Sequence, residues 1–163
     1  MSDTLAFGQY LTLRTAEETG GYLFQNYWVN EDAPFFNVVT GVPNMFGFMP
    51  FAFSGTTFTK SGDNQPATLA FPNNALSRGW AETAVTDKWL ANVRTVLIDP
   101  DNKENYTLLN VYIGQIVSAS WDETTLQLRL ASVFDATGAD VPRKRLTKQL
   151  VGNLPLTASV RVQ

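Results

Sequence analysis

The side chains available for chemistry are carboxylates, lysines, hydroxyls and phenols, because the sequence contains neither histidine nor cysteine. This excludes imidazole-based triads, thiolate nucleophiles, disulfides, and metal or iron–sulfur sites built from His and Cys. One acidic group comprises Asp99, Asp101 and Glu104. It lacks the glycine and the final glutamate of an EF-hand loop, and is typical of a hairpin turn.

Asp122 and Glu123 form the second acidic group. Adjacent carboxylates on a turn point in different directions, whereas glycoside hydrolysis needs two carboxyl groups that face one substrate. We therefore predict that the chain is not an enzyme and uses no metal or cofactor. A carboxylate hydrolase of cell-wall sugars remains an alternative, and loss of activity in Asp122→Asn or Glu123→Gln is its test.

The segment 45–53 is strongly apolar, and seven of the eleven phenylalanines fall between Phe35 and Phe58. Aromatic side chains and methionine are enriched at the centres of protein interfaces, and Pro50 cannot donate a hydrogen bond within a sheet. The pattern favours either an apolar loop that docks another subunit or an ordinary buried strand. The residues predicted to make the contact are Phe46, Phe48, Met49 and Phe51.

A basic cluster lies near the end of the sequence. Residues 141–163 carry a charge of +5, whereas residues 1–140 carry −8. This asymmetry suits an electrostatic contact between copies, although a solvated helix face has the same pattern. The residues of the cluster are Arg143, Lys144, Arg145 and Lys148.

Four tryptophans offer a third kind of candidate site, a platform on which sugars stack. Tryptophans on predicted strands and helices more often belong to the core. A carbohydrate-binding β-module that recognises a host-surface glycan is therefore the alternative function. The tryptophans are Trp28, Trp80, Trp89 and Trp121.

Composition sets the scale of the fold. With 163 residues, 44% of them hydrophobic, the chain is long enough for one domain with a core, here residues 1–163. The net charge of −3 argues against general nucleic-acid binding, and only 17% of residues are charged, which favours a surface partly covered by other chains. The uncharged stretch 33–59 is interrupted by prolines and glycines, so we predict no membrane span.

Short aromatic and β-branched runs between turn residues predict an all-β fold, a β-barrel or sandwich with one or two short helices inserted. The strongest signal is an antiparallel meander over residues 93–131, in which Leu109, Val111 and Ile113 share one face of a strand. Further strands are predicted over 22–29, 35–40, 51–58, 66–71 and 157–162.

A helix is predicted between residues 74 and 93, because apolar side chains recur at every fourth position over 81–93. Ser77 and Thr86 are its candidate N-caps. A second short helix is predicted over 143–150.

The order of features between Phe53 and Ala131 resembles the amino-terminal β-domain of the minor tail protein L family of lambda-like siphophages, and related hub and distal tail proteins of gene-transfer agents. In that family an aromatic–polar–glycine passage leads to a Pro-Thr-Leu and Asn passage, then to a helix and a strand. The matching positions are Phe58, Gly62, Pro66, Thr68, Leu69 and Asn73.

The resemblance implies a non-catalytic structural protein of the virion, made in the host cytoplasm. Such a protein forms a three-fold or six-fold ring at the tail tip, in the hub or distal tail position. Its partners would be copies of itself, the tail tube protein, and the hub and tape-measure proteins. The iron–sulfur cluster of the lambda-like proteins is not implied here, because this sequence has no cysteine.

Overall fold

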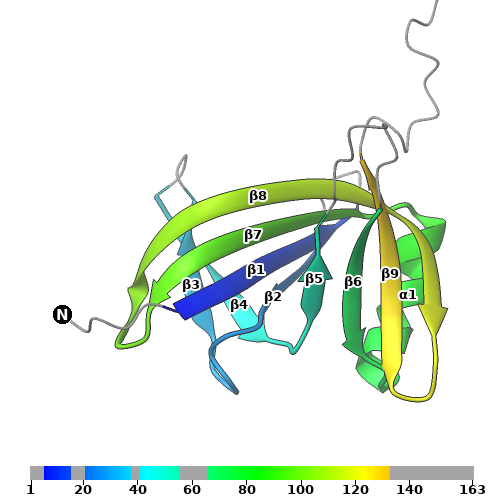
Figure 1. The fold of residues 1–163 in the computed structure, drawn as a ribbon, viewed down its shortest axis with the longest axis horizontal. Helices are drawn as coiled ribbons and strands as arrows, with labels where there is room; N and C mark the ends of the chain where they lie inside the picture. The colour runs from blue at the N-terminus through cyan, green and yellow to red at the C-terminus, as the bar shows by residue number, and fades with distance from the viewer. Residues whose placement is uncertain (1–5, 16–20, 38–40, 56–65, 133–163) are drawn as a thin grey trace, which may run out of the picture.

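The computed structural model describes residues 6–15, 21–37, 41–55 and 66–132, and these form nine β-strands and one helix (Figure 1). The all-β prediction is therefore confirmed. In chain order the elements are β1 (Ala6–Arg14), β2 (Gly21–Gln25), β3 (Ala33–Phe36), β4 (Pro43–Phe48), β5 (Ala52–Ser54), β6 (Ala67–Pro72), α1 (Ala75–Thr86), β7 (Leu90–Asp99), β8 (Asn102–Trp121) and β9 (Thr125–Ser132).

The strands form one sheet in the order β3-β4-β2-β1-β7-β8-β9-β6-β5. All pairs are antiparallel except β2 with β4. The sheet curls, because β8 arches across the molecule and bends to join β9 (Figure 1). The segment between β4 and β5 returns to β2: the Met49 amide donates to the Gln25 carbonyl at 2.9 Å, and Asn26 Nδ2 donates to the Phe51 carbonyl at 3.1 Å. The result is a barrel-like sheet with no pairing between its β3 and β5 edges among the described residues.

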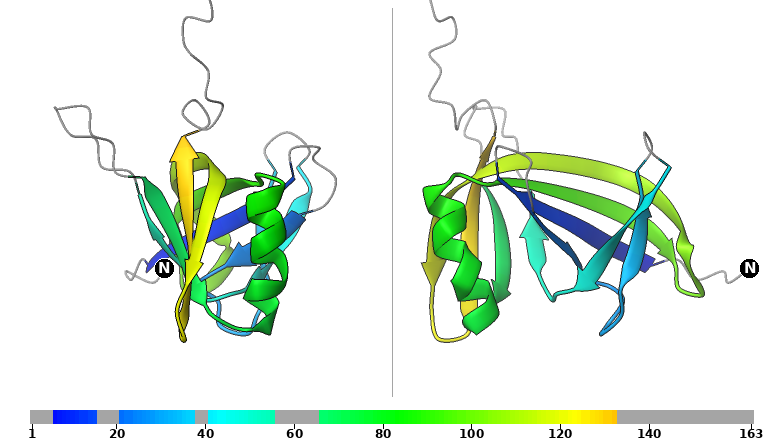
Figure 2. Two further views of the ribbon diagram at one scale, coloured as in Figure 1. Left: turned by 90° about the vertical axis from the view of Figure 1, so that its right-hand side faces the viewer. Right: turned by 180° about the vertical axis from the view of Figure 1, so that it is seen from behind.

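Helix α1 lies at one end of the molecule, away from the β3–β4 hairpin (Figure 2). Neither predicted cap begins the helix, because Asn74, three residues before Ser77, is the N-cap: its side chain accepts from the Ser77 amide at 2.9 Å, and Ser77 Oγ accepts from the Asn74 amide at 3.1 Å. Thr86 is the last residue of the helix. The apolar side chains at every fourth position therefore do not continue along the helix to Trp89, which lies between α1 and β7. The second predicted helix lies outside the described residues.

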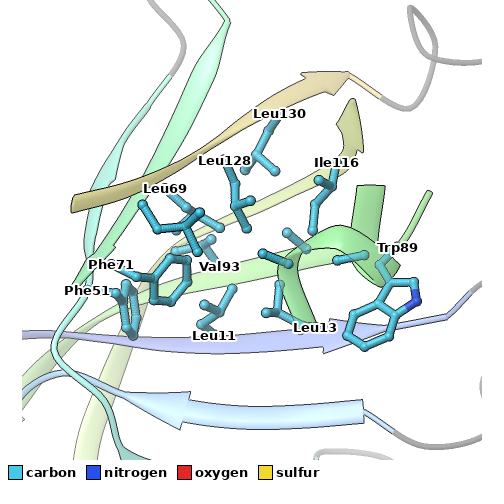
Figure 3. Packing of buried hydrophobic residues seen from close by; sticks show 14 of the residues in the cluster. Leu11, Leu13, Phe51, Leu69, Phe71, Trp89, Val93, Ile116, Leu128 and Leu130 are labelled. Carbon is cyan, nitrogen blue, oxygen red and sulfur yellow. The ribbon is translucent and has the colours of Figure 1, made fainter. Parts of the chain in front are cut away.

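The larger core fills the space between the curled sheet and α1 (Figure 3). Leu11, Val93 and Leu128 are completely or almost completely buried there, and they come from β1, β7 and β9. Burying such side chains contributes roughly 1.5–3 kcal/mol each. The other side chains labelled in Figure 3 are Leu13, Phe51, Leu69, Phe71, Trp89, Ile116 and Leu130.

A second, smaller core lies on the opposite face of β1 and β7. Tyr10 is adjacent to Leu11 in β1, so the two side chains point to opposite faces of the sheet. The Tyr10 ring packs against Phe35 and Phe46 of the β3–β4 hairpin, with centroids 5.0 and 5.1 Å apart. The central strand pair is therefore apolar on both faces.

Candidate interaction surface

The predicted apolar contact lies mostly inside the chain itself. Phe46 is 1% exposed, Met49 5% and Phe51 7%, so of the two alternatives the structure shows burial for these three residues rather than an exposed docking surface. Phe46 belongs to the smaller core, and Met49 and Phe51 belong to the larger one. Phe48 is half-buried. Proline and glycine do not keep this segment out of the sheet, because Pro43 begins β4 and Gly47 pairs with Phe24 of β2.

The predicted basic cluster of Arg143, Lys144, Arg145 and Lys148 lies outside the described residues, and its role stays a prediction.

Exposed apolar side chains gather instead on β8. We define the β8 stripe as Leu108, Leu109, Val111 and Ile113, each 44–50% exposed. Val111 pairs with Arg94 and Ile113 with Asn92, so these two side chains share a face, as predicted. Leu108 joins that face because the register shifts between Thr95 and Val96 and places Leu108 opposite Val96.

The β8 stripe extends the face that holds the smaller core. The cross-strand row runs from Tyr10 on β1 through Arg94 on β7 to Val111 on β8. The β3–β4 hairpin covers this row at Tyr10 and reaches Arg94, whose guanidinium lies 5.1 Å from the centre of the Phe35 ring. Val111 lies beyond the hairpin and is exposed. Leu108 lies opposite the buried Val96, so the stripe continues the face of the smaller core at that point, whereas Arg94 interrupts the apolar surface opposite Val111.

The same part of β8 has an open backbone edge. Among the described residues, β9 pairs with β8 only from Gly114 to Trp121, and β7 pairs with it up to Gln115. Within the part of the chain that the structure describes, residues 102–113 of β8 therefore have one strand neighbour, β7. Long, exposed apolar edges are templates for pairing with another chain.

Arginines flank the β8 stripe. Arg94 Nη1 donates to Thr12 Oγ1 at 3.2 Å, which fixes its guanidinium over β1. Burial, together with the neighbouring positive charge of Arg14, lowers the pKa of Arg94 below its ordinary value. Arg129 on β9 pairs with Ser118 and points away from the larger core. This face of the sheet therefore carries Arg94 beside the stripe and Arg129 further along the β8–β9 pair.

Acidic residues gather around the β7–β8 turn, where β8 begins. Asp101 and Glu104 are exposed there, and Asp99 accepts from the Asp101 amide at 3.0 Å. Glu31 approaches the same end through an ion pair with Lys103. In this turn the backbone amides of Asp101 and Glu104 each donate to the side chain two residues earlier, as in a tight hairpin. This agrees with the sequence interpretation.

Within the described ranges, no group of three or more acidic side chains is arranged to hold a metal ion. No helix of that part of the chain is long and apolar enough to cross a membrane. The chain matches no model of a known protein family and no curated protein.

Proposed function

We propose that the chain is a non-catalytic structural protein of a tailed-phage virion, in which copies form a ring at the tail tip, in the hub or distal tail position. The observation that carries the assembly part is the β8 stripe, on a strand edge that is open among residues 6–132 as far as the structure describes them. The virion part rests on the resemblance of the sequence from Phe53 to Ala131 to the minor tail protein L family. Copies of the chain are the proposed occupant of the stripe, with the tail tube, hub and tape-measure proteins as further neighbours.

Charge complementarity supports a second copy as the occupant. The face around the stripe carries Arg94 and Arg129, whereas the β7–β8 turn carries Asp101 and Glu104. The acidic turn of one copy can therefore face the positive, apolar sheet of the next. Such a contact joins two different surfaces, and contacts of this kind form a ring when the rotation from one copy to the next closes.

Light scattering of the purified 18.0 kDa chain over a concentration series tests the assembly part. We expect multiples of the monomer mass that grow with concentration and reach a closed number. Replacing Val111 and Ile113 together by serine should raise the midpoint concentration about tenfold or more, because both side chains leave water only in the assembly. Monomers at every concentration would overturn this part of the proposal.

The matched control is Leu76→Ser, which removes a similarly exposed apolar side chain from α1. It should leave the midpoint unchanged. Asp101→Lys with Glu104→Lys should weaken assembly, and the wild-type midpoint should rise with salt, because surface charges are screened. A midpoint unaffected by both the serine and the lysine variants contradicts the proposed contact.

The virion assignment has its own test. An antibody against the chain should label the tail tip of purified particles in electron microscopy. Labelling elsewhere on the particle, or none, contradicts the tail-tip assignment even if the chain assembles in solution.

A further inference from the structure

An exposed indole lies where helix α1 meets the β8–β9 hairpin. Trp121 is 54% exposed, whereas Trp80 and Trp89 are buried in the larger core. Trp121 is the last residue of β8 and pairs with the fully buried Leu126 of β9. Its backbone is thus held in the sheet while its ring faces solvent.

Trp121 lines two neighbouring hollows. The first, of about 170 Å³, lies against the helix and is completed by Arg78, Ala81, Glu82 and Leu126. The second, of about 190 Å³, lies at the hairpin and is completed by Ser120, Asp122, Thr125 and Gln127. An apolar ring between shallow hollows with polar walls has the character of a small-molecule subsite, in which the ring supplies contact area and the polar groups supply orientation.

Asn73 fixes the two sides of this region to each other. Its amide donates to the Thr124 carbonyl at 2.8 Å, and its side-chain nitrogen donates to the Asp122 carbonyl. Its side-chain oxygen accepts from Arg78 Nε at 2.5 Å. The helix and the hairpin are therefore joined by one side chain, so the walls of both hollows keep their positions before a ligand arrives.

Asp122 has one carboxylate oxygen engaged and one available. Oδ1 accepts from the amides of Thr124 and Thr125 at 2.8 and 2.7 Å. Oδ2 has no hydrogen-bond partner among the described residues. The fixed carboxylate can thus accept from a ligand hydroxyl.

The charge of this region selects the class of ligand. Arg78 is its one cation among residues 73–82 and 120–127, whereas Glu82, Asp122 and Glu123 are acidic. An anionic ligand would be repelled. Ionised carboxylates are hydrogen-bond acceptors only, so they match a ligand rich in hydroxyl donors. A single aromatic ring is too little for the cage that recognises quaternary ammonium groups.

We propose that Trp121 forms a binding subsite for a neutral carbohydrate. One pyranose face stacks on the indole, and sugar hydroxyls donate to Glu82 or to Asp122, with Gln127 as a further partner. This subsite does not depend on the proposed ring, since it uses other residues than the β8 stripe.

The experiment is a titration of the full chain with maltohexaose, cellohexaose and chitohexaose, followed by the four indole N–H signals in nitrogen-edited NMR. We expect one of these sugars to move the Trp121 signal and to leave those of buried Trp80 and Trp89 in place. Trp121→Ala should weaken binding about tenfold or more, because the stacking surface is lost. Glu82→Gln and Gln127→Ala should weaken it less.

Phe7→Ala is the matched control, because Phe7 is an exposed aromatic residue on β1, outside both hollows. It should bind the sugar as the wild type does. The proposal is overturned if none of the three sugars moves the Trp121 signal, or if Trp121→Ala binds equally well. It is also overturned if choline or a sialylated trisaccharide moves the signal while the neutral sugars do not.

Discussion

The side chain of Gln25 forms hydrogen bonds in both directions with the backbone of Trp28. Its Nε2 donates to the Trp28 carbonyl at 2.7 Å, and its Oε1 accepts from the Trp28 amide at 2.7 Å. Nε2 also donates to the Glu31 carbonyl, and Oε1 accepts from the Tyr27 amide. Gln25 is almost completely buried, so one amide group replaces the backbone partners that the segment after β2 lacks.

Gln25→Glu tests this arrangement with almost no change of shape. A carboxylate keeps the acceptor but cannot donate to the carbonyls of Trp28 and Glu31, and it introduces a buried charge. We expect a loss of about 3 kcal/mol or more in the free energy of unfolding, measured by denaturant titration. Gln127→Glu, at an exposed position, should change it by no more than about 0.5 kcal/mol. Equal losses in the two variants would contradict the proposed role of Gln25.

Tyr10 predicts a loss of stability at alkaline pH. Burial, with a smaller contribution from Tyr106, raises the pKa of Tyr10 from 10.0 to about 12. Between these values the unfolded chain has released the phenolic proton and the folded chain still holds it, so stability falls as pH rises. Tyr10→Phe should reduce this slope. It should not weaken the protein at neutral pH, because the buried hydroxyl has no partner among the described residues. Denaturant midpoints measured across this pH range check both expectations.

The N-cap of α1 predicts a moderate stability change. Asn74→Ala removes the bond to the Ser77 amide and should cost about 1 kcal/mol, whereas Asn74→Asp keeps an acceptor and should cost less. Ser77→Ala should cost more than Asn74→Ala, since Ser77 is buried and also donates to the Pro72 carbonyl at 2.7 Å. Thermal unfolding of the three variants gives the order, and an Asn74→Ala variant as stable as the wild type would contradict Asn74 as the N-cap.

Asp122 predicts a titration that NMR can follow. The amides of Thr124 and then Thr125 lower the pKa of its carboxyl below the ordinary value. Because the folded-state pKa is depressed, the contribution to stability is present above the unfolded-state pKa and is lost as pH falls through the folded-state value. Thr124→Val removes the hydrogen bond from the Thr124 hydroxyl to Asp122 and keeps the two amide bonds. The pKa of Asp122, followed by the NMR signal of its carboxyl carbon, should therefore remain low. An ordinary value in the wild type would show that the turn opens in solution.

The meander was predictable from the sequence because its alternation is regular. Leu126, Leu128 and Leu130 all point into the larger core, and β7, β8 and β9 pair in chain order. The strand β1 was not predicted, since Tyr10 and Leu11 are both buried, on opposite faces, and alternation is lost. The proline and glycine of the segment around β4 leave a loop and a buried strand both open, but in the sheet Pro43 lies opposite Phe36 and Gly47 lies opposite Phe24.

The candidate surfaces were harder to predict. The sequence pattern predicts that Leu109, Val111 and Ile113 share one face of a strand. It does not predict that the β3–β4 hairpin leaves this face exposed. The many apolar residues around Phe46 are compatible both with burial in the core and with a contact to another subunit. The packing of Phe46 against Tyr10 decides in favour of the core. Trp121 ends β8 at the turn to β9, whereas Trp89 lies between α1 and β7, and neither composition nor periodicity encodes which of the two is exposed.

The pairing of β1 with β7 has a consequence for how the chain reaches its native state. Ala6 lies opposite Ile98, and Arg14 lies opposite Leu90, so β1, which also pairs with the nearby β2, finds this second neighbour only after residues 90–99 have been made. Local hairpins such as β7–β8 and β8–β9 close short loops at a low entropic cost, whereas this pair closes a long one. During synthesis β1 can therefore pair with β2 soon after both are made, and its pairing with β7 comes later. Until then the edge of β1 that faces β7 stays unpaired.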